Sequence, residues 1–294
     1  MESLIQESTE KKKVALLSVF AAIFLTLSKF VIGMITGSLG ILSEALHSAL
    51  DLVAAVITYF SVQISNKPAD NDHHYGHGKI ENISALLETF LLLITCSWII
   101  YEAIHRLTTG EFHIDASIWA FLVVITSIII DYTRSRALKE AAQKYNSQAL
   151  EADALHFSTD IWSSTVVFIG LIGAHFGWHF ADPIAALIVA MIVIYVSLKL
   201  GRRSIDVLLD KAPTQYIQIV EDILKENLQV SYFHDLKIRD SGANVFIDIT
   251  IHVDPKMNIE QVHQITDKVE NQIQQKIKRS VIHIHQEPED DARP

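Results

Sequence analysis

The chain has 294 residues, of which 50% are hydrophobic and 20% are charged, and its formal net charge is −10. Its mean hydropathy of +0.27 is too high for an ordinary soluble domain. The negative charge argues against a nucleic-acid partner, because nucleic acids select basic surfaces. Cys96 is the single cysteine, which excludes an intrachain disulfide and a zinc site built from cysteines.

Six apolar runs precede a more polar C-terminal part. They span about residues 14–36, 39–64, 83–104, 115–135, 152–175 and 183–200. Each run is close to or longer than the ~20 residues that cross a bilayer as a helix. We therefore expect an α-helical membrane domain with six transmembrane helices over residues 1–211, and a separate cytoplasmic domain over residues 212–294. No cleavable signal peptide is expected, because a full-length span directly follows the polar N-terminal segment.

Basic residues alternate between the two sides of these runs. They gather in the N-terminal segment, in the loop at 66–81 and after the fourth and sixth runs, whereas the opposite loops carry only Arg106. The positive-inside rule then predicts a multi-pass protein of the inner (plasma) membrane with both termini cytoplasmic. The fourth run is expected to continue as a polar helix through about Tyr145, carrying Arg134, Arg136 and Lys139 into the cytosol.

Two H-x-x-x-D pairs lie inside apolar runs. One is His47 with Asp51 in the second run, and the other is His156 with Asp160 in the fifth. Residues i and i+4 share a helix face, so each pair directs an imidazole and a carboxylate the same way. Two such helices packed together would supply two nitrogen and two oxygen ligands, a tetrahedral set that favours Zn²⁺. Fe²⁺, Cd²⁺ and Mn²⁺ remain open as the main ion.

These ligands imply that protons compete with the metal. A histidine must lose its proton to bind a metal, and imidazole titrates near physiological pH. A site open alternately to the cytosol and to a more acidic outside would carry metal out and protons in. A membrane metal sensor without transport remains an alternative. An intramembrane zinc protease is excluded, because the sequence has no H-E-x-x-H motif. We therefore expect no enzyme.

Two further histidine-rich segments lie outside the apolar runs. The loop Asp70–Lys79 holds three histidines and two aspartates, a dense set of metal ligands that a solvated polar loop would also explain. The C-terminal part predicts the order α-β-β-α-β, a small α+β domain. Its candidate ligands are His234, Asp248, His252, His263, His283, His285 and Glu287. Neighbours of the same strand two residues apart share a face, as His283 and His285 would.

The chain resembles the cation diffusion facilitator family. The resemblance rests on the six runs, the two H-x-x-x-D pairs, the loop Tyr75–Glu81, the segment Leu208–Asp210 and the α-β-β-α-β tail, and it extends from about Lys12 to Pro288. It implies a homodimer in the lipid bilayer that exports divalent metal by proton antiport, and a tail of metallochaperone-like fold that binds regulatory Zn²⁺.

The resemblance also implies roles for particular residues. His47, Asp51, His156 and Asp160 would form the transport site, with the histidine at position 47 typical of zinc-selective members. Asp70, His73 and His77 would form a loop site. Lys79 and Asp210 would pair at the membrane surface and lock the dimer. His234, His285 and Glu287 would bind metal in the tail.

The tail departs from the family pattern at three positions. Thr250 stands where many relatives have a histidine, with His252 two residues later, and Glu287 replaces an aspartate. His283 is an additional histidine on the last strand. We therefore expect His234, His252, His283, His285 and Glu287 to contribute to tail binding in a combination that the sequence leaves open.

Overall fold

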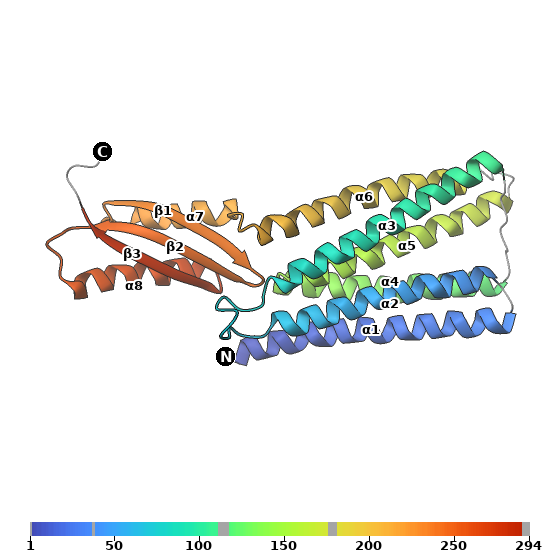
Figure 1. The fold of residues 1–294 in the computed structure, drawn as a ribbon, viewed down its shortest axis with the longest axis horizontal. Helices are drawn as coiled ribbons and strands as arrows, with labels where there is room; N and C mark the ends of the chain where they lie inside the picture. Colours follow the sequence, from blue (N-terminus) through green and yellow to red (C-terminus); the bar gives the residue numbers. More distant parts are fainter. Residues whose placement is uncertain (1, 37–38, 111–117, 176–180, 290–294) are drawn as a thin grey trace. The chain divides into compact units, whose positions relative to one another are not determined.

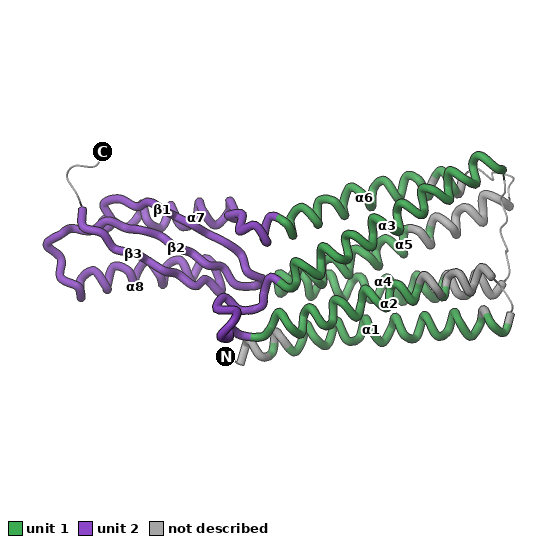
Figure 2. Tube along the Cα trace, viewed as in Figure 1, with its two compact units in different colours: residues 1–67, 80–205 green, residues 68–79, 206–294 purple. Residues whose placement is uncertain are grey.

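The computed structural model describes residues 2–36, 39–110, 118–175 and 181–289 (Figure 1). The chain divides into two compact units, one of residues 1–67 and 80–205 and the other of residues 68–79 and 206–294 (Figure 2).

The first unit consists of long helices, as the six apolar runs predict. They are α1 (Glu2–Thr36), α2 (Leu39–Ser65), α3 (Ile80–Thr109), α4 (Ile118–Tyr145), α5 (Gln148–His175) and α6 (Ala181–Leu208). Over the residues that the structure describes, three segments are long and apolar enough to cross a membrane, namely Thr9–Ile32, Ser48–Ser65 and Ile80–Thr109. The expected helical membrane domain is confirmed.

Small residues let these helices approach closely, as is usual in membranes. Alanines such as Ala15, Ala55 and Ala149 are fully buried in one cluster with Phe157, which joins α1, α2, α4 and α5. A second cluster, of Leu92, Cys96, Ala190 and Val193, joins α3 to α6. Large apolar side chains point outward instead, for example those at positions 20, 24 and 98, which suits helices surrounded by lipid.

The second unit contains a small α+β domain in the order predicted. Its elements are α7 (Thr214–Glu226), β1 (Tyr232–Ser241), β2 (Asn244–Val253), α8 (Ile259–Lys276) and β3 (Ser280–Pro288). The sheet order is β1-β2-β3, with β1 antiparallel and β3 parallel to β2. Alternation along β2 buries Ile247, Ile249 and Ile251 against α7 and α8. The other face of the sheet carries the polar residues of the same strands.

The loop at 68–79 belongs to the second unit, whereas its place in the sequence predicted that it would belong to the membrane domain. Its backbone packs on the two-residue turn between β1 and β2. A Cβ at Gly78 would lie 2.4 Å from the Ser241 carbonyl oxygen, and one at Gly242, which has a φ of +62°, would lie 2.8 Å from the Gly78 Cα. Side chains add to this contact, because the ring of Tyr75 lies edge-on to that of Phe246 at 5.1 Å. The loop is therefore anchored to the sheet.

Candidate metal sites

The first candidate site lies inside the helical unit, where α2 meets α5. The Nε2 atom of His156 is 3.0 Å from Asp51 Oδ1 and 3.8 Å from Asp160 Oδ2. One ligand atom from each residue lies within 4.8 Å of the others, and all three side chains are buried. The spacing of four residues places His156 and Asp160 on one face of α5, as predicted. A buried imidazole between two carboxylates is a set that binds a divalent transition metal.

His47 is the fourth predicted ligand of this site. It lies in α2, one helical turn before Asp51. Its side chain falls outside the residues that the structure describes, so its part in the site stays a prediction.

Buried charges surround this site, and most of them were not predicted from the sequence. Lys29 of α1 donates to Ser48 Oγ at 2.8 Å, and Arg134 of α4 donates to Asp131 at 3.2 Å and to Ser18 at 3.1 Å. Of the residues expected to reach the cytosol, Arg136 and Lys139 are exposed, whereas the side chain of Arg134 is only 7% exposed and packs inside the bundle. Its guanidinium lies 3.5 Å from the ring centroid of Phe157 instead. The carboxylate and the aromatic face offset part of the cost of burying this cation.

Two carboxyl groups are also fully buried inside the bundle. Glu88 of α3 is fully buried and accepts hydrogen bonds from Thr58 and Ser84. Asp153 of α5 is also fully buried and accepts a bond from Ser18 at 3.3 Å. A charged residue inside an apolar run is itself the signal for such positions, because its burial in a membrane requires a partner or a function.

The second candidate site is the loop of the second unit. The carboxylate of Asp70 lies 3.3 Å from His73 Nδ1 and 3.4 Å from His77 Nε2. The backbone N–H groups of His73 and Asp72 donate to Asp70 Oδ1, which lowers the pKa of this carboxyl below its usual value. Within the part of the chain that the structure describes, the buried Nδ1 of His77 has no hydrogen-bond partner. The three predicted loop residues thus come together, with ligand atoms within 4.8 Å of one another.

The third candidate site lies on the polar face of the tail sheet. The Oε2 atom of Glu287 in β3 is 3.7 Å from His234 Nε2 in β1 and 3.5 Å from His252 Nε2 in β2. Strand register explains this, because His252 pairs directly with Glu287 across the parallel ladder. The imidazole of His252 is buried, and its ring centroid is 5.2 Å from that of His234.

The other tail histidines take different positions along the same face. His285 Nε2 is 3.7 Å from the second oxygen of Glu287, and Thr250 is its neighbour on β2. His283 lies one pair further along, with its Nδ1 3.8 Å from Asp248 Oδ1. His234, His252 and Glu287 form the compact group, His285 borders it, and His283 is separate. Thr250 is the direct register partner of His234, so His252 approaches His234 from the next pair along the same face.

The predicted pair of Lys79 with Asp210 forms within one chain. Lys79 Nζ is 2.7 Å from Asp210 Oδ1, and Arg239 is 3.6 Å from the other oxygen. The bond from Lys79 is the main cause that lowers the pKa of Asp210 below its usual value. Both partners are partly exposed to solvent, with side-chain exposures of 31% and 43%. The pair therefore has the modest strength of a screened surface interaction.

The Lys79–Asp210 pair is expected to stabilise the protein only above the acidic range. Because the folded pKa of Asp210 is depressed, its contribution is fully present above the unfolded value of about 4 and is lost as the pH falls through the folded pKa. A double-mutant cycle of Lys79→Met and Asp210→Asn in thermal unfolding should give a coupling of about 0.2–1 kcal/mol near neutral pH. An undiminished coupling at pH values well below the folded pKa would contradict this assignment.

Two family models together cover almost the whole chain. The cation efflux transmembrane domain matches residues 15–209, and the cation efflux protein cytoplasmic domain matches residues 212–289. The chain belongs to the cation diffusion facilitator family. This cation diffusion facilitator is a transmembrane transporter for the efflux of divalent metal cations. Its cytoplasmic domain is of the family's dimerisation type.

Full-length relatives agree with this assignment. An uncharacterized transporter of Methanocaldococcus jannaschii is 30% identical over 281 residues, which cover 94% of this facilitator and 98% of the relative. The cation-efflux pump FieF of Shewanella oneidensis is 28% identical over 272 residues, 92% of each chain. The metal-bound C-terminal domain of the CzcD transporter from Thermotoga maritima is 25% identical, with a TM-score of 0.26, and covers 27% of this chain and 93% of that domain.

Proposed function

We propose that this facilitator exports Zn²⁺ from the cytoplasm in exchange for H⁺, through a transport site of His47, Asp51, His156 and Asp160. The observation that carries the proposal is the convergence of Asp51, His156 and Asp160 between α2 and α5, with ligand atoms within 4.8 Å of one another. Ionisable groups buried inside a membrane domain are costly, and where they occur together they mark the pathway of an ion or substrate.

The ligand chemistry favours zinc as the cargo. The described part of the site offers one imidazole nitrogen and two carboxylates, and the imidazole of His47 would complete a four-coordinate set. Zn²⁺ accepts tetrahedral nitrogen and oxygen ligands, whereas Mn²⁺ favours more oxygen atoms. Fe²⁺ and Cd²⁺ accept similar ligands and are the main rivals.

Proton exchange follows from the same ligands. Zinc binds the neutral imidazole of a histidine, so loading from the cytosol releases protons and protonation from the outside releases zinc. Alternating access of one site to the two sides is then sufficient to couple the two flows. Both termini would lie in the cytoplasm, as the distribution of basic residues predicts.

The two groups in the second unit would be cytoplasmic zinc sites rather than transport sites. Asp70, His73 and His77 would bind one ion, and His234, His252 and Glu287 another, with His285 beside it and His283 in an accessory position. Within each group the ligand atoms lie within 4.8 Å of one another, and both groups belong to segments outside the helical bundle, which supports this division. The tail would assemble the homodimer.

Transport of four ions into proteoliposomes tests the proposal. Purified protein should take up Zn²⁺ when a pH gradient is imposed, and uptake should stop when the gradient is collapsed with an ionophore. Fe²⁺, Cd²⁺ and Mn²⁺ are measured in parallel in separate samples. Faster uptake of one of these ions would assign it as the cargo, and zinc binding without any ion uptake would favour a membrane metal sensor.

A further inference from the structure

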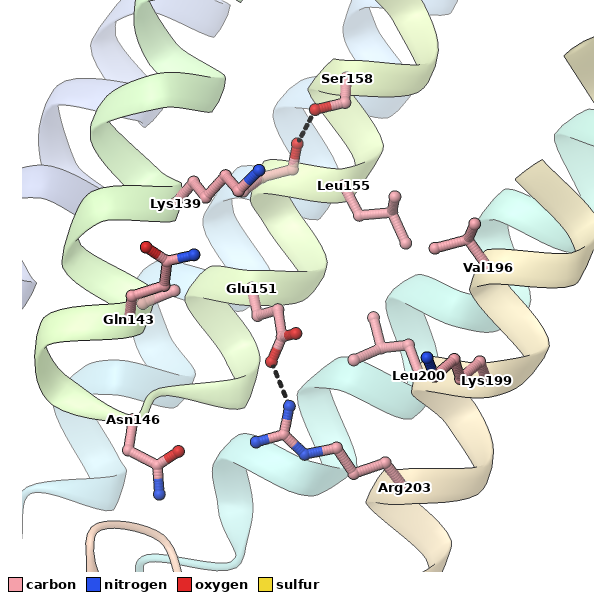
Figure 3. Close-up of a pocket in the computed structure, with 12 residues that line it drawn as sticks. Lys139, Gln143, Asn146, Glu151, Leu155, Ser158, Val196, Lys199, Leu200 and Arg203 are labelled. Atoms are coloured by element: carbon pink, nitrogen blue, oxygen red, sulfur yellow. Dashed lines mark hydrogen bonds and ion pairs between the residues drawn. The ribbon is translucent and has the colours of Figure 1, made fainter. Parts of the chain in front are cut away.

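A cavity of about 490 Å³ lies within the helical unit between α4, α5 and α6, and none of its lining residues is a candidate metal ligand (Figure 3). It is placed near the C-terminal ends of α4 and α6 and the N-terminal end of α5. This is the end of the bundle at which the basic residues gather, and the positive-inside rule assigns it to the cytoplasmic surface. The transport proposal does not use this cavity.

The rim of the cavity is basic. Lys139 of α4 and Lys199 and Arg203 of α6 line it, against one carboxylate, that of Glu151. Arg203 donates to Glu151 at 2.7 Å, and both side chains are about half exposed. Neither lysine has an ion-pair partner in the parts of the chain that the structure describes, and both are exposed. Two uncompensated cations are therefore available to an anion.

The wall of the cavity is apolar. Leu155 of α5 faces Val196 and Leu200 of α6, whereas Lys139 stands on the opposite side and the Glu151–Arg203 pair closes the lower end (Figure 3). Lys199 and Arg203 are four residues apart and so share a face of α6. The cavity thus places cations and an apolar wall beside one another near the ends of these helices.

We infer that this cavity binds the phosphate headgroup of an acidic phospholipid. The phosphate would lie between Lys139 and Lys199, and an acyl chain would cover Leu155, Val196 and Leu200. Basic pockets between transmembrane helices on the cytoplasmic side bind such headgroups, since the cations attract the phosphate and the helices replace neighbouring lipid. Free phosphate shares the charge but not the acyl chain, so the apolar wall favours the lipid.

A lipid bound in the cavity would contact α5, the helix that carries two of the candidate transport ligands. Ser158 lines the cavity from α5, between the two residues His156 and Asp160 that face the candidate transport site. A lipid in the cavity would support α5 from the side opposite to the metal ligands and would fill the space between α5 and α6. Lipid binding itself does not depend on the transport proposal, because none of its residues is a proposed metal ligand.

Lipid binding to the purified full-length protein tests the inference. Native mass spectrometry would compare phosphatidylglycerol with phosphatidylcholine of the same acyl chains, and inorganic phosphate would be added as the free anion. Lys139→Gln with Lys199→Gln is expected to weaken phosphatidylglycerol binding about 10- to 30-fold. Glu151→Gln is expected to strengthen it, because Arg203 then loses its internal partner.

A matched control separates the cavity from general charge. Lys13→Gln with Arg136→Gln removes the same number of cations from exposed positions that do not line the cavity, and it should leave the affinity unchanged. Equal loss in the control, equal binding of both lipids, or displacement of the lipid by inorganic phosphate at equal concentration would each overturn the inference. Zinc uptake by the variant of Lys139 and Lys199 is measured in a separate experiment, so that failure of the transport proposal is recognised independently of lipid binding.

Discussion

An Asp160→Asn variant is expected to lose zinc transport by more than about 100-fold, because even changes to groups that only orient a metal ligand cost roughly 10- to 100-fold. The amide keeps the shape of the side chain but removes the negative charge that lies 3.8 Å from His156 Nε2. Zinc uptake by proteoliposomes measures the effect, and zinc titration of the same preparation shows whether binding is lost with transport.

Thr159→Val is the matched control for this variant. Thr159 is the buried neighbour of Asp160, and its hydroxyl donates to the carbonyl of Leu155 within α5. The valine keeps the shape of this side chain and removes only a hydroxyl that bonds within the helix, so uptake by the variant should stay near that of the wild type. Wild-type uptake by Asp160→Asn, or equal loss in Thr159→Val, would remove Asp160 from the transport site.

Arg134→Met is expected to destabilise the helical unit by about 3–5 kcal/mol, the usual cost of removing one partner of a buried ion pair. The substitution leaves the carboxylate of Asp131 buried without the guanidinium that lies 3.2 Å away. It also removes the cation from the face of Phe157 and the hydrogen bond that Arg134 donates to Ser18. The free energy of unfolding in mixed micelles measures the loss.

The double variant Asp131→Asn with Arg134→Met distinguishes a broken ion pair from lost packing. Removing both charges should restore much of the stability, since no uncompensated carboxylate remains. Arg136→Met is the exposed comparison on the same helix, because its pair with Glu140 is two-thirds exposed and should change stability by less than about 1 kcal/mol. No recovery in the double variant would mean that Arg134 acts through packing alone.

The sequence was sufficient to predict the elements that periodicity defines. The spacing of His156 and Asp160 placed both side chains on one helix face, and they do lie together beside Asp51. The order α-β-β-α-β predicted for the tail is also found, and alternation along β2 places Ile247, Ile249 and Ile251 on one buried face. Such predictions succeed because the repeat of a helix or strand fixes where its side chains point.

The sequence was not sufficient where partners come from distant segments. Arg134 follows an apolar run, and nothing in its own helix shows whether its side chain reaches water or turns inward to Phe157. The same is true of the tail, in which the register between β2 and β3 pairs His252 with Glu287 and Asp248 with His283. The anchoring of the 68–79 loop to the tail likewise depends on a backbone contact between Gly78 and Gly242.

The most direct test of proton-coupled export is to measure protons and zinc together. Sealed proteoliposomes that contain a pH indicator and a zinc indicator are exposed to a zinc pulse, with Asp160→Asn as the reference. We expect zinc entry to drive protons out of the wild-type vesicles at a fixed ratio, and neither ion to move through the variant. Zinc entry with no proton movement, or proton movement that persists in Asp160→Asn, would contradict exchange at the site formed by Asp51, His156 and Asp160.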